Sequence, residues 1–121
     1  MFREVLAEVV DRTEGGIAAL VMGMDGIAVE QYLKEDAQPF EVETIGMEYS
    51  VILRDIRKAS ELVDGGVARE VTIQGEKLTT VIRLINEEYF VAVAIRPDGN
   101  FGKARYLLRT GASKLATELG A

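Results

Sequence analysis

Two segments of the chain combine β-strand composition with apolar residues at both odd and even positions: Ile17–Met24 and Tyr89–Ile95. Successive side chains of a strand point to opposite faces of its sheet, so a strand of this kind needs cover on both faces. The two segments are therefore predicted to be central strands of a sheet that lies between two other layers.

Three segments with helical periodicity can supply those layers: Phe2–Thr13, Val42–Val63 and a final helix that ends near Leu119. Gly-Gly pairs follow the first and second of them and are typical of helix ends. In the long middle helix one broad apolar stripe is predicted to pack on the sheet. Its members are Val42, Ile45, Tyr49, Ile52, Leu53, Ile56 and Val63.

Three further strands complete the sheet: Ile27–Leu33, Val67–Gln74 and Lys77–Ile85. Short turns join the strands, Asp25-Gly26 being a strong hairpin signal, and such turns require antiparallel pairing. Lys34–Pro39 is polar and is predicted to be a loop. The fold class is thus α+β, with a five-stranded antiparallel sheet in a three-layer α/β/α sandwich. Its element order is αββαβββα over a single domain, residues 1–121, with the long helix alone on one face.

The composition excludes several kinds of active site. The 121 residues contain no His and no Cys, which removes imidazole bases, thiolate nucleophiles and Cys/His zinc sites. Gly99-Asn100-Phe101-Gly102 lacks the spacing of a phosphate-binding loop and is better explained as a tight strand-to-helix connection. No catalytic residue, metal or cofactor is predicted, although carboxylate or Lys chemistry stays open.

The charge balance bears on partners and location. With 14 Lys+Arg against 20 Asp+Glu the net charge is −6, which disfavours binding to nucleic acid or to an anionic membrane surface. No apolar run approaches the ~20 residues of a membrane span, and the first residues do not resemble a signal peptide. A cytoplasmic protein is expected.

The strand Val67–Gln74 has apolar residues on one of its two faces only, which is typical of a sheet edge. It contains no Pro, and an exposed edge invites pairing with another chain. We therefore expect dimer pairing along this strand, with Arg69 and Glu70 as charges that could instead protect the edge. The predicted dimer-edge residues are Val67, Arg69, Val71 and Ile73.

The long helix has a second apolar line beside basic residues. An apolar line with a charged rim is typical of a contact surface, although isolated exposed apolar residues are also common. Arg57 lies nearer the predicted sheet side. The predicted partner-binding residues are Met47, Val51, Arg54, Lys58 and Leu62.

Two motifs in this order resemble the roadblock/dynein light chain family, in particular its small bacterial and archaeal members. The segment from Gly15-Gly16-Ile17 through Met24-Asp25-Gly26 to Val29 looks like the family's first hairpin. Asn100-Phe101-Gly102-Lys103-Ala104-Arg105, with the later Leu108-Arg109, is similar to its final-helix signature. Together with the element order, the resemblance covers essentially the full chain and implies the roadblock, profilin-like fold.

The resemblance implies a non-enzymatic dimerisation module. In the family, the third strands pair into one continuous sheet and the long second helices lie side by side. Similar bacterial members act with a Ras-like small GTPase, as in the gliding-motility switch, and can stimulate hydrolysis by arranging the GTPase's own residues. We therefore expect a homodimeric, cytoplasmic regulator of a Ras-like GTPase. The alternatives are a scaffold for a motor or polarity complex, then a small-molecule sensor, with an enzyme last.

Overall fold

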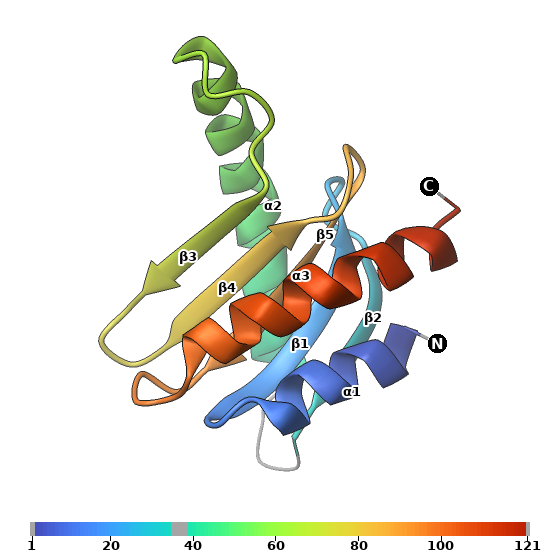
Figure 1. Cartoon of the computed structure of the whole chain (residues 1–121), viewed down its shortest axis with the longest axis vertical. Helices are drawn as coiled ribbons and strands as arrows, with labels where there is room; N and C mark the ends of the chain where they lie inside the picture. The colour runs from blue at the N-terminus through green and yellow to red at the C-terminus, as the bar shows by residue number, and fades with distance from the viewer. Residues whose placement is uncertain (1, 35–38, 121) are drawn as a thin grey trace.

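The structure is a computed structural model and describes residues 2–34 and 39–120, of which residues 39–43 by their backbone alone. Three helices and five strands follow one another in the predicted order (Figure 1). Their bounds are α1 Phe2–Arg12, β1 Gly16–Gly23, β2 Ala28–Leu33, α2 Pro39–Leu62, β3 Glu70–Gln74, β4 Thr79–Leu84, β5 Tyr89–Ile95 and α3 Phe101–Glu118.

The five strands form one antiparallel sheet in the order β2-β1-β5-β4-β3. The two segments that are apolar at both parities became β1 and β5, and both lie in the interior of the sheet. The prediction of central strands is thus confirmed. The strand predicted from Val67 is an edge strand, with β2 at the opposite edge.

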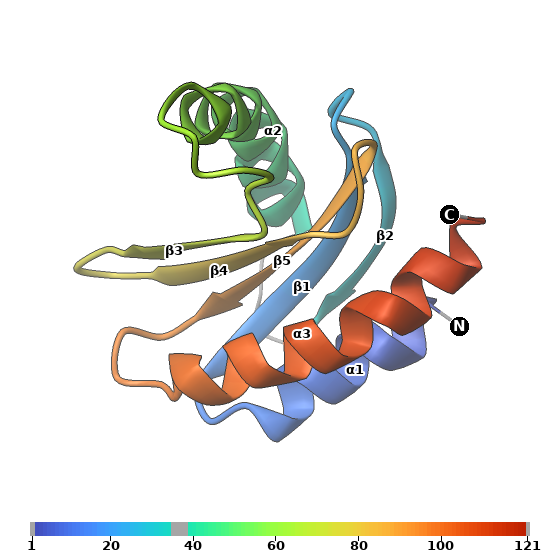
Figure 2. The ribbon, with the colours of Figure 1, turned by 45° about the horizontal axis from the view of Figure 1, so that its top comes forward.

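The helices cover the two faces as the sequence predicted. In Figure 2, α1 and α3 lie side by side on one face and α2 lies alone on the other. Each face has its own apolar core. Under α1 and α3 the core includes Leu6, Val21, Val93 and Leu108, whereas under α2 it includes Leu20, Met22, Leu53, Ile82 and Phe90.

The strand-to-helix connection before α3 is tight, as predicted. A Cβ on Gly99 would lie 2.5 Å from the Glu14 carbonyl oxygen, so a larger residue does not fit there. The Asn100 side chain accepts a hydrogen bond of 3.0 Å from the Lys103 backbone N–H and caps the helix. These residues therefore build a connection, and their arrangement needs no bound anion to explain it.

The predicted starts of β3 and α2 each differ from the structure by three residues, and several other boundaries differ by one or two. β3 begins at Glu70 and not at Val67, because the chain from Val67 to Ala68 belongs to the connection that follows α2. The Arg69 carbonyl still accepts a hydrogen bond of 2.9 Å from the Leu84 N–H and so starts the ladder. Most of the predicted loop Lys34–Pro39 lies outside the described residues, and α2 starts at Pro39.

The prediction that the whole apolar stripe of α2 packs on the sheet is wrong in part. Leu53 is 1% exposed and Tyr49 and Ile56 are half-buried, but Ile45, Ile52 and Val63 lie at the surface. The side chain of Val42 lies outside the described residues. For Val63 the reason is the path of α2, whose C-terminal part extends past the end of the sheet (Figure 1). Ile45 and Ile52 lie about 80–100° around the helix from the buried Leu53, at the margin of the side that packs on the sheet. The sheet of one chain therefore covers only one side of the stripe.

Candidate functional site

The outer edge of β3 presents free backbone groups. In an antiparallel pair, residues alternate between exchanging hydrogen bonds with the partner strand and pointing away from it. The Arg69–Leu84 bond and the register with β4 place the N–H and C=O of Glu70, Thr72 and Gln74 on the outer side. Within the part of the chain that the structure describes, no side chain bonds to these groups. The edge is open to another strand.

The other sheet edge, β2, is closed by side chains at Gln31, although among the described residues none bonds to the outward backbone groups of Leu33. The register with β1 turns the backbone groups of Gln31 outward. The Glu30 Oε1 accepts from the Gln31 N–H at 3.0 Å, and the Arg3 Nη1 donates to the Gln31 carbonyl at 3.2 Å. A β-bulge leaves Val29 without a partner residue on β1 and disrupts the edge further.

The predicted dimer-edge residues lie where β3 starts and along its length. Val67 and Arg69 are exposed and precede the strand. Val71 is half-buried under α2, and Ile73 lies at the surface on the same face of the sheet as α2. The edge therefore has an apolar side toward α2. The opposite side carries Glu70, Thr72 and Gln74.

The outward face of α2 carries three of the predicted partner-binding residues. Met47, Val51 and Leu62 are 51%, 57% and 77% exposed. Lys58 is also exposed and falls on the same line at 100° per residue. The structure thus brings these four side chains together on the side of α2 that faces away from the sheet.

The fifth predicted residue, Arg54, is held differently. Its guanidinium donates to the Met24 carbonyl in the β1–β2 turn. One turn later, Arg57 donates from Nη1 to the Glu87 carbonyl and from Nη2 to the Asn86 carbonyl, both at 2.9 Å, in the β4–β5 turn. Two turns of the sheet therefore hold the middle of α2. Sequence reasoning missed this role, because backbone carbonyls leave no trace in residue identity.

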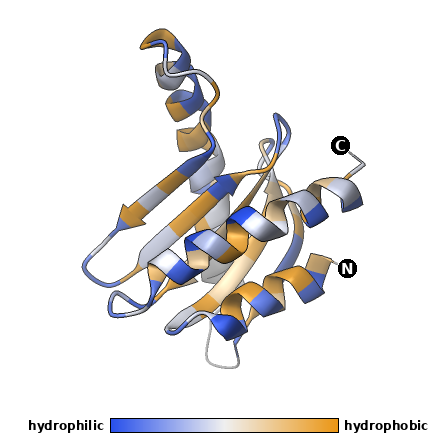
Figure 3. Cartoon of the chain, in the orientation of Figure 1, coloured by the Kyte–Doolittle hydropathy of each residue, from blue (hydrophilic) through white to orange (hydrophobic). Residues whose placement is uncertain are grey.

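A second exposed line runs along the side of α2 that faces β3. It consists of Ile45, Ile52, Ala59 and Val63, which we call the α2 flank. Ile52 is 45% exposed and sits midway between Ile45 and Ala59 in a spacing of seven residues. Apolar residues continue to the free end of α2 (Figure 3). Sequence periodicity had placed Ile45, Ile52 and Val63 in the core, and Ala59 lies between Ile52 and Val63 on the same line.

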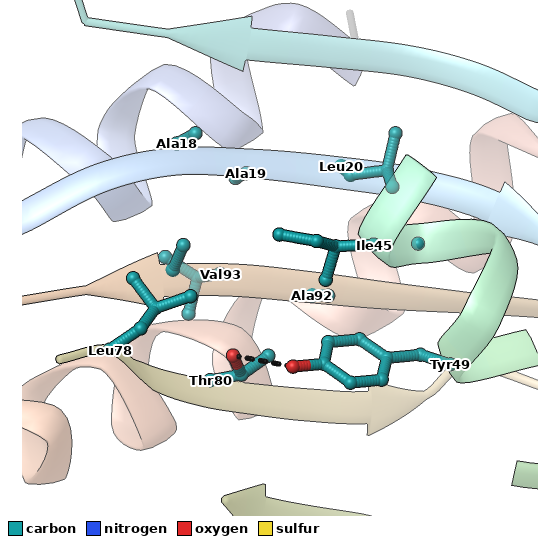
Figure 4. A pocket seen from close by; sticks show the side chains of 11 residues that line it. Ala18, Ala19, Leu20, Ile45, Tyr49, Leu78, Thr80, Ala92 and Val93 are labelled. Atoms are coloured by element: carbon teal, nitrogen blue, oxygen red, sulfur yellow. Dashed lines mark hydrogen bonds between the residues drawn. The ribbon is translucent and has the colours of Figure 1, made fainter. Parts of the chain in front are cut away.

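A small apolar cavity lies between the N-terminal half of α2 and the sheet (Figure 4). Its volume is about 40 Å³. The Tyr49 hydroxyl and the Thr80 hydroxyl in its wall lie 3.2 Å apart and bond to each other. The residues that line it are Ala18, Ala19, Leu20, Ile45, Gly46, Tyr49, Leu78, Thr80, Ala92, Val93 and Ala94.

Two polar contacts tie the edge strands to the helices on the other face. Glu70 on β3 accepts from Nε and Nη2 of Arg105 on α3, at 2.9 and 2.8 Å, and this hydrogen bond raises the pKa of the Arg105 guanidinium. Tyr32 on β2 donates to the Asp11 carboxylate on α1 at 3.0 Å, and this bond raises the pKa of the Tyr32 phenol. Both contacts are exposed, so they fix positions more than they add stability.

Among residues 2–34 and 39–120, no group of three or more potential ligands is placed to hold a metal ion. Over the same residues, no helix is long and apolar enough to cross a bilayer.

Comparison with protein-family models finds no match, and neither does comparison with curated proteins. Solved structures do match over nearly the whole chain. MglC from Myxococcus xanthus is 40% identical, with 97% of this chain and 98% of that chain covered and a TM-score of 0.69. A Roadblock/LC7 domain from Streptomyces avermitilis is 15% identical over 98% of both chains, with a TM-score of 0.86. The gliding protein MglB from Thermus thermophilus is 19% identical over 94% and 84%, with a TM-score of 0.84.

Sequence identity and TM-score rank these three structures in opposite order. The two measures support different statements about the chain. The two structures below 25% identity establish the fold, which is that of a Roadblock/LC7 domain. MglC, at 40% identity over almost all of both chains, establishes kinship. The chain belongs to the roadblock/LC7 family.

Proposed function

We propose that this chain is a homodimeric, non-enzymatic regulator of a Ras-like small GTPase. The observation that carries the proposal is the open edge of β3 beside the uncovered α2 flank. Together they offer backbone hydrogen bonds and apolar area to a second copy of the chain. The names of two similar structures, MglC and a gliding protein MglB, support a role in the same kind of system.

The proposed dimer would give each of the three surfaces, the β3 edge, the α2 flank and the outward line of α2, a separate role. Pairing of β3 with its copy extends the sheet, and the two α2 flanks then cover each other. The outward line of Met47, Val51, Lys58 and Leu62 stays free in such a dimer and offers a platform to the GTPase. An apolar centre with a charged rim is the usual composition of a protein–protein interface.

The platform would act by positioning and not by direct chemistry. Arg54 and Arg57 are the two arginines of α2, and both guanidiniums already bond to turn carbonyls. Neither is poised to stabilise the transition state as an arginine finger does. Any acceleration of hydrolysis would therefore come from ordering the GTPase's own catalytic residues, since positioning accounts for much of phosphoryl-transfer catalysis.

The same apolar platform also supports a second candidate function. A scaffold for a motor or polarity complex needs a docking surface but no effect on nucleotide chemistry, and an outward line without a free arginine fits that role equally. Binding that ignores the nucleotide state of the GTPase would favour the scaffold.

The test is single-turnover GTP hydrolysis by a Ras-like GTPase from the same genome, with and without this protein. We expect faster hydrolysis and measurable binding. Val51→Asp should weaken binding about tenfold or more, because it places an unpaired carboxylate inside the interface. Ile27→Asp is the matched control, since Ile27 is also more than half exposed but lies in the β1–β2 turn. An unchanged rate together with no binding would refute the proposal.

A further inference from the structure

The free end of α2 carries large apolar side chains that the chain itself does not cover. Leu62 and Val63 are each 77% exposed, and Val67 in the following connection is 72% exposed. This end is nevertheless ordered by its own hydrogen bonds: the Gly65 N–H donates to the Ser60 carbonyl, and the Ser60 hydroxyl donates to the Gly66 carbonyl, both at 2.7 Å. An ordered apolar end of this kind is typical of a contact surface.

The cavity under α2 lies at the opposite end of the helix and has complementary properties. Its floor is made of small residues such as Ala18, Ala92 and Ala94, and its one polar pair is internally satisfied. A volume of about 40 Å³ is far below the several hundred Å³ of a small-molecule site. It is large enough for the branched end of one aliphatic side chain.

Symmetry brings the two features together. When β3 pairs antiparallel with its copy, a two-fold axis reverses the direction of everything on that face of the sheet. The C-terminal half of one α2 then lies beside the N-terminal half of the other. The seven-residue spacing of the α2 flank fits this arrangement, because Ile52 would meet its own copy while Ile45 meets Ala59. Val63, one turn beyond Ala59, would then lie level with position 41, one turn before Ile45 at the edge of the cavity.

We propose that Val63 of one copy, together with Val67, closes the apolar cavity of the other copy, and that the contact is made twice in the dimer. Each cavity wall, with Ile45, Tyr49 and Leu78, is then a binding site that the described residues of a single chain leave incomplete. This inference rests on the proposed dimer, and the experiment below separates the two.

The chain contains no Cys, so introduced cysteines report contacts without background. We expect the double variant Val63→Cys/Leu78→Cys to form a covalent dimer with a short bis-maleimide, whereas neither single variant does. Ile52→Cys alone should cross-link, because Ile52 would face its own copy across the two-fold axis. Leu62→Cys/Leu78→Cys is the matched control and should stay uncoupled, since Leu62 points outward from the pair of helices.

The outcomes are distinguishable. Cross-linking of Ile52→Cys without that of Val63→Cys/Leu78→Cys overturns the cavity contact and leaves the proposed dimer standing. Cross-linking of Val63→Cys alone indicates parallel helices and overturns the antiparallel dimer as well. Failure of all these variants to cross-link, with native circular dichroism, overturns both proposals.

A second measurement avoids cysteine chemistry. Val63→Asp should raise the dimer dissociation constant about tenfold or more, because it places a carboxylate in an apolar cavity. Leu62→Asp, at a neighbouring residue of equal exposure, should leave the dimer unchanged. Equal effects of the two substitutions would overturn the cavity contact.

Discussion

The two edges of the sheet are treated in opposite ways. At β2, a bulge and the side chains of Glu30 and Arg3 occupy the outward backbone groups around Gln31. At β3, the outward groups of Glu70, Thr72 and Gln74 meet no side chain among the described residues. Edges are usually blunted to prevent association. The two edges therefore differ in how accessible their backbone groups are, and the proposed dimer uses the open one.

The surroundings of the two edges reinforce the contrast. Beside β3, the α2 flank and Ile73 offer apolar area on one face, and the Arg105–Glu70 ion pair fixes the first residue of the strand from the other face. Beside β2, the Tyr32–Asp11 hydrogen bond ties the strand to its own helix α1. The β3 edge thus keeps apolar area and free backbone groups, whereas β2 is tied to α1 of its own domain.

The largest effect is expected from a proline at the open edge. Thr72→Pro removes an N–H that points away from β4, so the monomer keeps its own ladder. The dimer would lose one hydrogen bond per copy at about 0.5–1.5 kcal/mol each. This predicts a rise of about 10- to 100-fold in the dimer dissociation constant, which sedimentation or light scattering over a dilution series would measure.

The matched control for that variant is Gln31→Pro at the closed edge. It also removes an outward N–H, but one whose acceptor is the neighbouring Glu30 side chain. We expect a lower melting temperature and an unchanged dimer. Equal weakening of the dimer by both prolines would show that the two edges do not differ in the proposed way.

A smaller effect is expected from opening the closed edge. The double variant Arg3→Ala/Glu30→Ala frees the N–H and C=O of Gln31, and should let β2 pair weakly with other chains. Light scattering should then detect mass above the dimer at high protein concentration only. If the mass stays that of a dimer at all concentrations, the bulge at Val29 alone protects this edge.

The smallest effect concerns pH at the closed edge. The hydrogen bond to Asp11 raises the pKa of the Tyr32 phenol, since the neutral phenol is the donor. A raised pKa in the folded state stabilises the fold fully below the unfolded pKa of about 10, and this contribution is lost as the pH rises through the folded value. Thermal melts between about pH 8 and 11 should therefore fall less steeply for Tyr32→Phe than for the natural chain. Parallel curves would contradict this role for Tyr32.

Much of the fold could be predicted from the sequence because its signals are local. Apolar residues at both odd and even positions identified β1 and β5 as the central strands, and helical periodicity placed three helices. The burial of the α2 stripe was harder to predict. Periodicity places Ile45, Ile52 and Val63 on one apolar stripe with Leu53 but does not show what covers each of them. In the structure, the sheet covers Leu53 but leaves those three exposed, so the same pattern includes both core and surface residues.

The candidate site could be predicted only in part, for the same reason. Exposure of Met47, Val51 and Leu62 followed from their angle on the helix and agrees with the structure. The position of the Arg54 side chain could not be predicted from its angle on the helix, because its hydrogen-bond partner is the Met24 carbonyl, thirty residues away in the chain. The start of β3 was placed too early, since Val67 looks like strand sequence but belongs to the connection after α2.

The carbonyl partners of Arg54 and Arg57 have a consequence for how this surface can evolve. Every residue type supplies a backbone carbonyl, so the side chains of Glu87 and Glu88 in the β4–β5 turn are free to change while α2 keeps its place. Asp25 is more constrained, because its carboxylate accepts a hydrogen bond of 3.0 Å from the Ile27 N–H within its own turn. Mutational drift in the β4–β5 turn can therefore alter the charge around the platform independently of its geometry. Related chains could acquire different partners on an unchanged frame.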